Sequence, residues 1–424
     1  MDIKVTLKNT DGKISAIPSK SDVHRALICA ALADRESRVN FACSSQDIDA
    51  TISCLVSLGA EIKRDGGGAT VVPIKEVKKN ILLDCGESGS TIRFMLPVAA
   101  ALGAEARFTG HGRLSQRPLE PLARVMEKNG CEFSRLGEFP LKVGGELKGS
   151  RYEIRGDVSS QYITGLLLSL PIFGRGGKIT VIPPIESEKY IDMTVDTMRK
   201  YGIDIKKDGN VFSVPSGSFY KVQNSVYSSD GDWSNAAFFL CAAAINGNNV
   251  KYEGVYKNSL QGDKKIVSVL KDFGANVTWG DDFVSVSSSG LKGIDIDASQ
   301  IPDLVPVLAV TAAFAEGKTK IYNAARLRIK ESDRLAAITK SLQNIGAEVK
   351  EYPDALEIIG SKNAKYQGTV DSFNDHRIVM SMAVASSNGG SITIKNAEAV
   401  NKSYPSFFED FKLLGGKCDV LQFR

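Results

Sequence analysis

The chain has 424 residues, which is too long for one ordinary hydrophobic core, so we expect two or three domains. Its 43% hydrophobic and 24% charged residues are typical of globular proteins and exclude a disordered or fibrous chain. The net charge is only +4 and no long Lys/Arg tract occurs, which argues against a nucleic-acid-binding protein.

The seven cysteines argue against two kinds of structure. Their number is odd and no two are spaced as CxxC, so neither a disulfide framework nor a zinc cluster is expected, and a reducing cytoplasm fits best. The first seven residues alternate like a strand and carry no export signal. The apolar stretches, such as 236–245, fall far short of the roughly 20 residues that span a bilayer. We therefore expect a cytoplasmic protein, most simply a monomer, that binds no metal, nucleic acid or membrane.

In chain order, a helix that ends at glycine and is followed by an alternating strand occurs six times. The first copy is LVSLGAEIKRD, in which Gly59 closes the helix. The five later glycines follow at intervals of 71, 72, 72, 72 and 69 residues and are Gly130, Gly202, Gly274, Gly346 and Gly415. Glycine after a helix favours a left-handed C-cap. The regular spacing, rather than any single glycine, indicates a repeat.

A second series of more apolar helices alternates with the first. These helices end at intervals of 69, 71, 73, 70 and 72 residues, at Asp34, Gly103, Gly174, Gly247, Gly317 and Gly389. Each of the five glycines is again predicted to be a left-handed cap. Each repeat of about 70 residues therefore contains two helices and several strands, too long for one layer of a solenoid.

The six repeats divide into two sets of three. The polar stretch 224–231 separates the sets and is the predicted crossover. The last copy stops at Arg424 before its hairpin is complete, whereas residues 3–7 form a lone strand, so we infer that these two segments complete one another. The prediction is an α/β (α+β) protein with one discontinuous domain, 1–18 plus 231–424, and a second domain, 19–230.

The starts of the six apolar helices carry chemistry beyond ordinary capping. Ser, Asp and Asn at these starts are good N-caps. Yet cations occur at three of the six starts, namely Lys20 with Arg25, Arg93, and Arg377. A helix N-terminus carries partial positive charge, so added cations are favourable only if a strongly anionic ligand binds among them.

More basic residues lie near the other helix starts, at Arg117, Lys330, Arg334 and Lys402. Equivalent helices within a set point the same way, and inter-domain clefts are common ligand sites. We therefore expect both sets to present their helix N-termini to one cationic cleft that binds phosphorylated small molecules.

The sequence segments at these starts resemble the 5-enolpyruvylshikimate-3-phosphate synthase family, also called 3-phosphoshikimate 1-carboxyvinyltransferases. The resemblance rests on PSKSDVHRAL, GESGSTIRF, QRPLEPL, SSQYITGLLL, EKYIDMT, IPDLVPVLA, RIKESDRL, NDHRIVMS and NKSYPSFF, in this order along nearly the whole chain. It implies two domains of three βαβαββ units each, an inside-out α/β barrel arrangement. It also implies a cofactor-free addition and elimination, in which the 5-hydroxyl of shikimate 3-phosphate attacks C2 of phosphoenolpyruvate and phosphate leaves.

The resemblance also assigns the binding residues. Those for shikimate 3-phosphate are Lys20, Ser21, Arg25, Ser159, Ser160, Gln161, Ser187, Asp303 and Lys330. Those for phosphoenolpyruvate are Lys20, Gly89, Arg117, Gln161, Arg334, Arg377 and Lys402. Hydroxyl and N–H groups suit phosphate oxygens, Arg offers a two-pronged fit to carboxylate or phosphate, and Gly89 permits close backbone approach.

Proton transfer needs groups that both give and accept protons. By position alone, Asp303 is a helix N-cap and Glu331 a helix-surface charge. The resemblance instead assigns Asp303 to the 5-hydroxyl and Glu331, with Lys20, to the methylene carbon of phosphoenolpyruvate. His376 orients a substrate, shares in proton transfer or makes a structural hydrogen bond, and the sequence leaves these alternatives open.

The resemblance implies that the chain is a target of glyphosate. Two departures from the family pattern, however, leave its sensitivity to inhibitors open, including its sensitivity to glyphosate. Glu87 replaces a usual Asn and adds a carboxylate near the phosphoenolpyruvate pocket, and Arg326 stands where others place an Asn.

Two alternative functions stay open. One is that of the sister transferase that uses UDP-N-acetylglucosamine, but Gly112 stands here at the position of its reactive Cys. The other is a non-catalytic module for phosphorylated ligands or RNA. That module should carry aromatic stacking platforms near its basic groups, and none is visible here.

Overall fold

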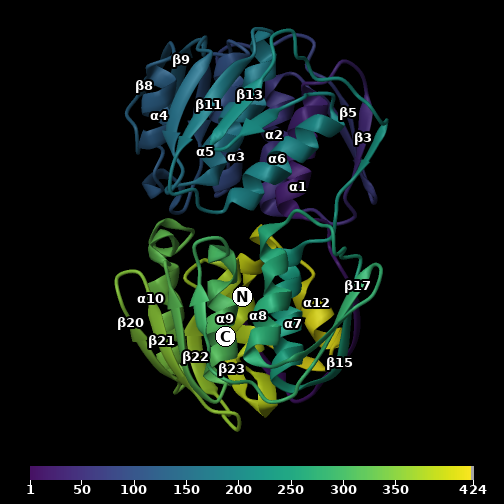
Figure 1. Cartoon of the computed structure of the whole chain (residues 1–424), viewed down its shortest axis with the longest axis vertical. Helices are drawn as coiled ribbons and strands as arrows, with labels where there is room; N and C mark the ends of the chain where they lie inside the picture. Colours follow the sequence, from purple (N-terminus) through teal and green to yellow (C-terminus); the bar gives the residue numbers. More distant parts are fainter. Residues whose placement is uncertain (422–424) are drawn as a thin grey trace. The chain divides into compact units, whose positions relative to one another are not determined.

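A computed structural model describes residues 1–421 of the chain (Figure 1). The chain forms two compact units. Unit 1 consists of Met1–Ile17 and Asp230–Arg424, described to residue 421, and unit 2 consists of Pro18–Ser229. Each unit contains three βαβαββ repeats.

Unit 2 begins with a helix, and the first strand of its first repeat comes from the end of the unit. The first repeat consists of β14 (Val226–Ser228), α1 (Lys20–Ala31), β3 (Ser37–Asn40), α2 (Gln46–Leu58), β4 (Glu61–Asp65) and β5 (Gly68–Val72). The second consists of β6 (Ile81–Asp84), α3 (Gly89–Ala101), β7 (Ala106–Thr109), α4 (Glu120–Glu127), β8 (Cys131–Ser134) and β9 (Leu141–Gly145). The third consists of β10 (Arg151–Arg155), α5 (Ser160–Ser169), β11 (Gly177–Ile182), α6 (Glu188–Lys200), β12 (Lys206–Asp208) and β13 (Val211–Val214).

Unit 1 uses the N-terminal segment for two of its strands. Its first repeat consists of β2 (Thr10–Ser15), α7 (Trp233–Asn246), β15 (Gly247–Glu253), α8 (Ile266–Phe273), β16 (Asn276–Trp279) and β17 (Phe283–Ser287). The second consists of β18 (Asp295–Asp297), α9 (Val305–Ala313), β19 (Gly317–Tyr322), α10 (Arg334–Asn344), β20 (Glu348–Glu351) and β21 (Leu356–Gly360). The third consists of β22 (Gln367–Asp371), α11 (His376–Val384), β23 (Ser391–Lys395), α12 (Phe407–Leu413), β24 (Gly416–Leu421) and β1 (Asp2–Leu7).

Short 3₁₀ helices supplement these elements. Those of unit 2 are η1 (Leu114–Gln116) and η2 (Leu170–Phe173). Those of unit 1 are η3 (Gly262–Lys265), η4 (Pro302–Leu304), η5 (Ala325–Ile329), η6 (Ser387–Gly389) and η7 (Ala397–Lys402).

Every repeat builds the same four-stranded mixed sheet. In the third repeat of unit 2 the order is β10-β11-β13-β12, with β10 parallel to β11 and the other neighbours antiparallel. Parallel neighbours need a long crossover, and the first helix of the repeat provides it. All six sheets formed by residues 1–421 follow this order. The predicted repeat is therefore confirmed at the level of strand pairing.

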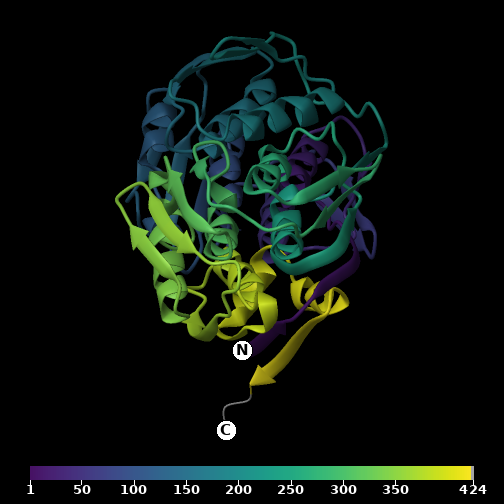
Figure 2. The ribbon, with the colours of Figure 1, turned by 60° about the horizontal axis from the view of Figure 1, so that its bottom comes forward.

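The N-terminal strand completes the last repeat, as predicted. β1 pairs with β24 in antiparallel register, for example Ile3 with Val420, and with β23 on its other side. Figure 2 shows the purple β1 and the yellow β24 side by side. Two segments at opposite ends of the sequence thus fill the places of a single hairpin.

The predicted crossover segment 224–231 contains a short strand that the sequence analysis did not identify. Val226–Ser228 forms β14 and pairs in parallel with β3. Three residues are too few to show a period in the sequence. β14 pairs with β3, whose edge would otherwise have unpaired backbone N–H and C=O groups.

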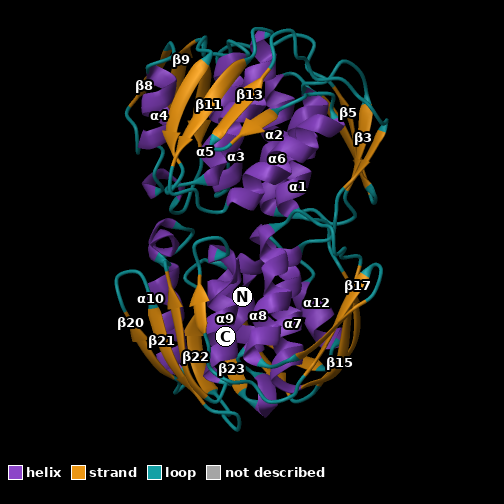
Figure 3. Cartoon of the chain, viewed as in Figure 1, coloured by secondary structure: helices purple, strands orange, loops and turns teal. Residues whose placement is uncertain are grey.

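The first helix of each repeat is buried in the interior of its unit, and the sheets lie on the outside (Figure 3). All nine residues of α9 are buried, as are 13 of the 14 residues of α7. This explains why these helices are apolar on every side rather than on one stripe. Among residues 1–421, no helix combines the length and apolar character needed to cross a bilayer.

The glycine prediction holds with one exception. All six glycines of the first series have positive φ, from +80° at Gly202 to +121° at Gly59. In the second series Gly103, Gly174, Gly317 and Gly389 also have positive φ. Gly247 does not, because its φ is −80° and α7 passes directly into β15. A Cβ there would lie 2.6 Å from the Cα of Ala243, so Gly247 is needed for close packing rather than for a left-handed cap.

Candidate functional site

In unit 1, Asp303 lies where three cations converge. It is in η4, just before α9, and accepts hydrogen bonds from Arg334 Nη1 at 2.8 Å, Arg377 Nη2 at 3.1 Å and Lys330 Nζ at 3.3 Å. Arg377 also donates through Nη1 to the Asp303 carbonyl at 3.1 Å. The side chain of Asp303 therefore joins cations of three elements instead of acting as a simple N-cap.

Asp375 belongs to the same cluster, and the sequence analysis did not assign it to the site. Its carboxylate is fully buried and accepts from Arg334 Nε at 2.8 Å and from the Ser332 hydroxyl at 3.0 Å. It also caps α11 by accepting from the backbone N–H of Arg377 at 2.9 Å. One carboxylate thus fixes both the guanidinium of Arg334 and the start of the helix that carries Arg377. Its N-cap position was visible in the sequence, but its partner 41 residues earlier was not.

Glu331 completes the surroundings of Arg334. Its Oε2 accepts from Arg334 Nη2 at 2.7 Å, so the guanidinium contacts Asp303, Glu331 and Asp375 together. Arg334 is only 1% exposed. Burial by itself lowers the pKa of Arg334, but the three carboxylates raise it above its usual value. Arg334 is therefore a permanent cation in a fixed orientation.

The electrostatics of Asp303 and Lys330 are coupled. Burial would raise the pKa of Asp303, but Arg377, Lys330 and Arg334 hold it well below its usual range. Burial, together with the nearby charges of Arg326 and Arg334, lowers the pKa of Lys330 to about 8, although the attraction of Asp303 opposes this shift. Lys330 thus titrates near neutral pH and can gain a proton when an anion binds.

Three more ionisable side chains, those of Asp263, Lys402 and His376, belong to unit 1. Asp263 is fully buried and accepts a hydrogen bond from the Ser234 hydroxyl at the start of α7. Burial and the nearby charge of Asp303 raise the pKa of Asp263 to about 6. Lys402, at the end of η7, donates to the Asn374 carbonyl at 2.6 Å, which places it beside the start of α11. His376 is buried in the first turn of α11.

In unit 2, the start of α1 is held by a carboxylate and by neutral oxygens. Lys20 Nζ lies 2.7 Å from Asp47 Oδ2, a partner on α2 that the sequence analysis did not identify. Arg25 is 1% exposed and donates to the Thr194 hydroxyl at 2.8 Å and to the Tyr190 carbonyl at 3.0 Å, both on α6. Burial lowers the pKa of Arg25 to about 10. Arg25 therefore ties α1 to α6, a structural function that its position at a helix start did not suggest.

The starts of α3 and α5 are joined through Gln161. Its Oε1 accepts from Arg93 Nη1 at 2.8 Å and its Nε2 donates to the Ser90 hydroxyl at 2.8 Å. Arg93 also donates through Nη2 to the Pro118 carbonyl at 3.2 Å. The segment after η1 is thereby anchored to both helices.

Arg117 approaches the backbone of Gly89 closely. A Cβ at Gly89 would collide with the guanidinium of Arg117. A protein cation occupies the space beside Gly89 here, and the predicted approach of a ligand to Gly89 stays a prediction. Gly89 and Arg117, both assigned to phosphoenolpyruvate by the resemblance, thus lie close together although they are 28 positions apart in the sequence.

The serine hydroxyls lie at two neighbouring helix starts. Ser159 caps α5 by accepting from the backbone N–H of Gln161 at 3.3 Å, and Ser160 is the first residue of that helix. Ser187 precedes α6 with a left-handed φ of +54°. All three are largely buried, and Ser21 in the first turn of α1 is partly buried. Serine N-caps that keep a hydroxyl proton can still donate to a bound anion.

Glu87 packs against Gly112. A Cβ at Gly112 would collide with the Glu87 carboxylate, and Gly112 has a φ of +59°. The Glu87 carboxylate is also 3.8 Å from His111 Nε2. A cysteine at position 112, as the sister transferase has, would require the Glu87 side chain to move and would adopt a strained backbone conformation. Glu87 and Gly112 thus form a local pair.

Each unit therefore presents helix starts with buried cations. In unit 1 the structure brings together Asp303, Lys330, Glu331, Arg334 and Arg377, with Lys402 beside the start of α11. In unit 2 it brings together Gly89 with Arg117, and Gln161 with Ser90 and Arg93. Fixed cations and helix N-termini bind phosphate and carboxylate, and adjacent carboxylates can transfer protons.

Comparison with known proteins first defines the class. The fold matches that of the enolpyruvyl transferase NikO from Streptomyces tendae with a TM-score of 0.76 at 16% identity, over 99% of this chain and 98% of that chain. It matches an EPSP synthase from Acinetobacter baumannii with a TM-score of 0.82 at 27% identity, over 99% of this chain and 100% of that chain. The chain thus has the fold of the enolpyruvyl transferases.

The family follows from the sequence. Residues 5–411 match the model of EPSP synthase (3-phosphoshikimate 1-carboxyvinyltransferase). The 3-phosphoshikimate 1-carboxyvinyltransferases of Clostridium novyi and Clostridium kluyveri are each 42% identical to the chain, over 98% of it and 98% of their own lengths. The chain belongs to the EPSP synthase family.

Proposed function

We propose that the chain transfers the enolpyruvyl group of phosphoenolpyruvate to the 5-hydroxyl of shikimate 3-phosphate and releases phosphate. This is the reaction of the shikimate pathway, which leads to chorismate and the aromatic amino acids. The observation that carries the proposal is the Asp303 network, in which a carboxylate able to accept a proton lies among three cations able to hold two anionic substrates.

The binding roles follow the family pattern. Shikimate 3-phosphate would contact Lys20, Ser21, Arg25, Ser159, Ser160, Gln161, Ser187, Asp303 and Lys330. Phosphoenolpyruvate would contact Lys20, Gly89, Arg117, Gln161, Arg334, Arg377 and Lys402. The buried hydroxyls at the starts of α5 and α6 and the fixed guanidinium of Arg334 support these assignments. The domain boundaries and a substrate site formed by both domains stay predictions, as do a monomeric state and a cytoplasmic location.

The proton transfers can be written from the residues. Asp303 would accept the proton of the 5-hydroxyl as its oxygen bonds to C2 of phosphoenolpyruvate. Glu331, with Lys20, would deliver a proton to C3, and the same groups would remove it when the C2–O bond to phosphate breaks. The double bond is thereby restored, and no cofactor is required.

The cations around Asp303 explain how its basicity can be switched. Without ligand, three cations keep its pKa well below the usual range, so it is a weak base. Substrate phosphates and carboxylates would compete for Lys330, Arg334 and Arg377. Each cation drawn toward a substrate stabilises the Asp303 anion less, so its pKa rises when both substrates are bound.

The decisive experiment is a phosphate-release assay with the full chain. We expect release of phosphate from phosphoenolpyruvate when shikimate 3-phosphate is present and none when it is omitted. UDP-N-acetylglucosamine in its place should give no release, whereas release with it would favour the sister transferase. Binding of both substrates without any release would favour a non-catalytic module and contradict the proposal.

A further inference from the structure

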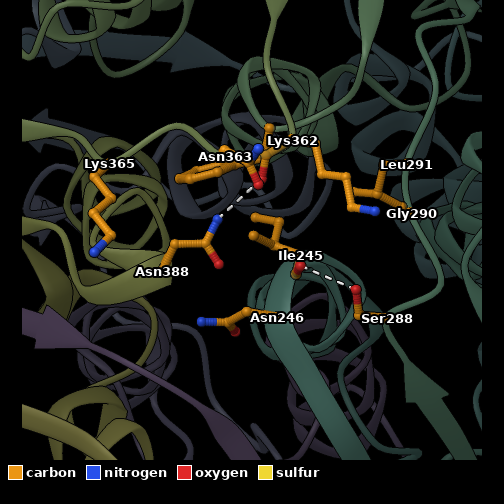
Figure 4. Close-up of a pocket in the computed structure, with 10 residues that line it drawn as sticks. Ile245, Asn246, Ser288, Gly290, Leu291, Lys362, Asn363, Lys365 and Asn388 are labelled. Atoms are coloured by element: carbon orange, nitrogen blue, oxygen red, sulfur yellow. Dashed lines mark hydrogen bonds between the residues drawn. The ribbon is translucent and has the colours of Figure 1, made fainter.

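A cavity of about 370 Å³ lies in unit 1 where the buried helices end. Ile245 and Asn246 close α7, Phe314 follows α9, and Asn388 lies in η6 after α11 (Figure 4). The candidate cluster is at the opposite ends of these helices, since Asp303 precedes α9 and Asp375 caps α11. The 14 residues of α7 span about 21 Å. The cavity is therefore separate from the residues proposed to bind the substrates.

The connections between repeats explain why unit 1 is open at this end. Residues 288–294 join β17 to β18 and residues 361–366 join β21 to β22, but only residues 8–9 join β1 to β2. The corresponding connections in unit 2 are 73–80, 146–150 and 215–225. Because one of its three connections has two residues, unit 1 has less chain available to cover the ends of its helices.

The lining combines an apolar floor with a cationic rim. Ile245, Leu291 and Phe314 are at most 9% exposed, whereas Lys362 and Lys365 are exposed. The lining contains these two lysines and no Asp or Glu. In Figure 4 the two lysine side chains lie on different sides of the cavity.

Some of the carbonyl groups at the negative ends of the helices already have hydrogen-bond donors other than the two lysines. The Ile245 carbonyl accepts from the Ser288 hydroxyl at 3.1 Å, and the Ala313 carbonyl accepts from the Tyr366 hydroxyl at 2.8 Å. Terminal carbonyls of α7 and α9 therefore have protein donors. Among the lining residues, none carries a negative charge that could pair with Lys362 or Lys365.

We propose that this cavity binds a small organic carboxylate with an apolar body, distinct from the two substrates. The apolar body would cover Ile245, Leu291 and Phe314, and the carboxylate would pair with Lys362 or Lys365. The cavity volume falls in the range of about 300–1,000 Å³ that is typical of small-molecule sites. A dianionic phosphate without an apolar body would leave the floor exposed and bind more weakly.

The test titrates the full chain with 3-phenylpropanoate, followed by ligand-observed NMR and calorimetry. We expect saturable binding with a dissociation constant on the order of 1 mM, as is typical of a ligand of this size. The variant K362A/K365A should bind at least about tenfold more weakly, whereas the matched variant K271A/K412A, with exposed lysines outside the cavity, should bind like the unmodified chain. 3-Phenylpropan-1-ol should bind more weakly than the acid and equally to both variants.

Two results would overturn the inference. One is the absence of saturable binding of 3-phenylpropanoate up to roughly ten times the expected constant. The other is equal binding to K362A/K365A and to the control variant, which would indicate adsorption elsewhere. Phosphate release by K362A/K365A should be unchanged. The binding readout does not require turnover, so this inference and the proposed function can fail independently.

Discussion

The two units hold their buried cations in different ways. In unit 1, Arg334 contacts three carboxylates, and Lys330 and Arg377 share one of them. In unit 2, Arg25 and Arg93 are held by hydroxyl, amide and carbonyl oxygens, which carry no net charge. Lys20 with Asp47 is the exception. The repeats are alike in topology, so this difference comes from side chains alone.

The difference teaches how one fold divides two tasks. Neutral acceptors orient a guanidinium without adding a negative charge at the contact, so the guanidinium can still bind an anion. Carboxylates compensate the charge and add groups that exchange protons. On the proposed roles, unit 2 contributes binding groups and Lys20, whereas unit 1 contributes binding groups and the two carboxylates that exchange protons.

The largest expected effect is on turnover and comes from unit 1. Asp303→Ala removes the proposed base, and we expect phosphate release to fall by about 10²–10⁴-fold. Asp303→Asn is the matched variant, because it keeps the shape and an oxygen acceptor but cannot take the proton, and should be nearly as slow. Near-normal turnover of Asp303→Ala would remove Asp303 from the mechanism and weaken the division between the units.

The next effect is on stability and tests the comparison directly. Asp375→Ala leaves the buried Arg334 without one of its carboxylates, so the free energy of unfolding should fall by about 3–5 kcal/mol. Arg93→Met in unit 2 breaks the hydrogen bonds to the neutral oxygens of Gln161 and Pro118 and should cost about 1–2 kcal/mol. Urea unfolding of both variants measures this. Equal losses would mean that charged and neutral partners are equivalent here.

A smaller effect concerns pH. Lys330 has a pKa of about 8 in the folded chain, and a bound phosphate should raise it, so binding takes up a proton above that pH. The affinity for shikimate 3-phosphate should therefore be constant below pH 8 and fall by up to about tenfold per pH unit above it. Lys330→Gln should bind more weakly and show a flatter profile. Calorimetry over pH 6.5–9.5 gives both, and an identical slope in the variant would assign the proton to another group.

The smallest effect compares two helix caps within unit 2. Ser88 accepts from the backbone N–H of Thr91 at 3.2 Å, whereas Ser19 makes no side-chain cap bond at the start of α1. Ser88→Ala should lower the free energy of unfolding by about 1 kcal/mol and Ser19→Ala by less than half of that. Thermal unfolding compares the two. If the losses are equal, the serine at the start of α1 has a capping role that its geometry does not indicate.

The repeat and its glycines could be predicted from the sequence because they depend on local conformation. A left-handed residue after a helix needs glycine wherever it occurs, so spacing alone revealed the repeats at Gly59 and its equivalents. Gly247 shows where this prediction fails. It is a glycine because it packs closely against Ala243, and the sequence does not distinguish this requirement from that of a left-handed cap. The short strand β14 is another limit, because it depends on a sheet edge about 190 residues earlier.

The sequence alone determined the two sets of three repeats, the closing of the last repeat by residues 3–7, and the cationic helix starts. These are fixed by residue type and spacing, which act over a few neighbours. Only the tertiary structure decided the partners of those cations: Asp375 for Arg334, Asp47 for Lys20 and α6 for Arg25. Two of these pairs join separate repeats, and Lys20 and Asp47 lie on different helices of one repeat. Their energy depends on burial and distance, which no local pattern records.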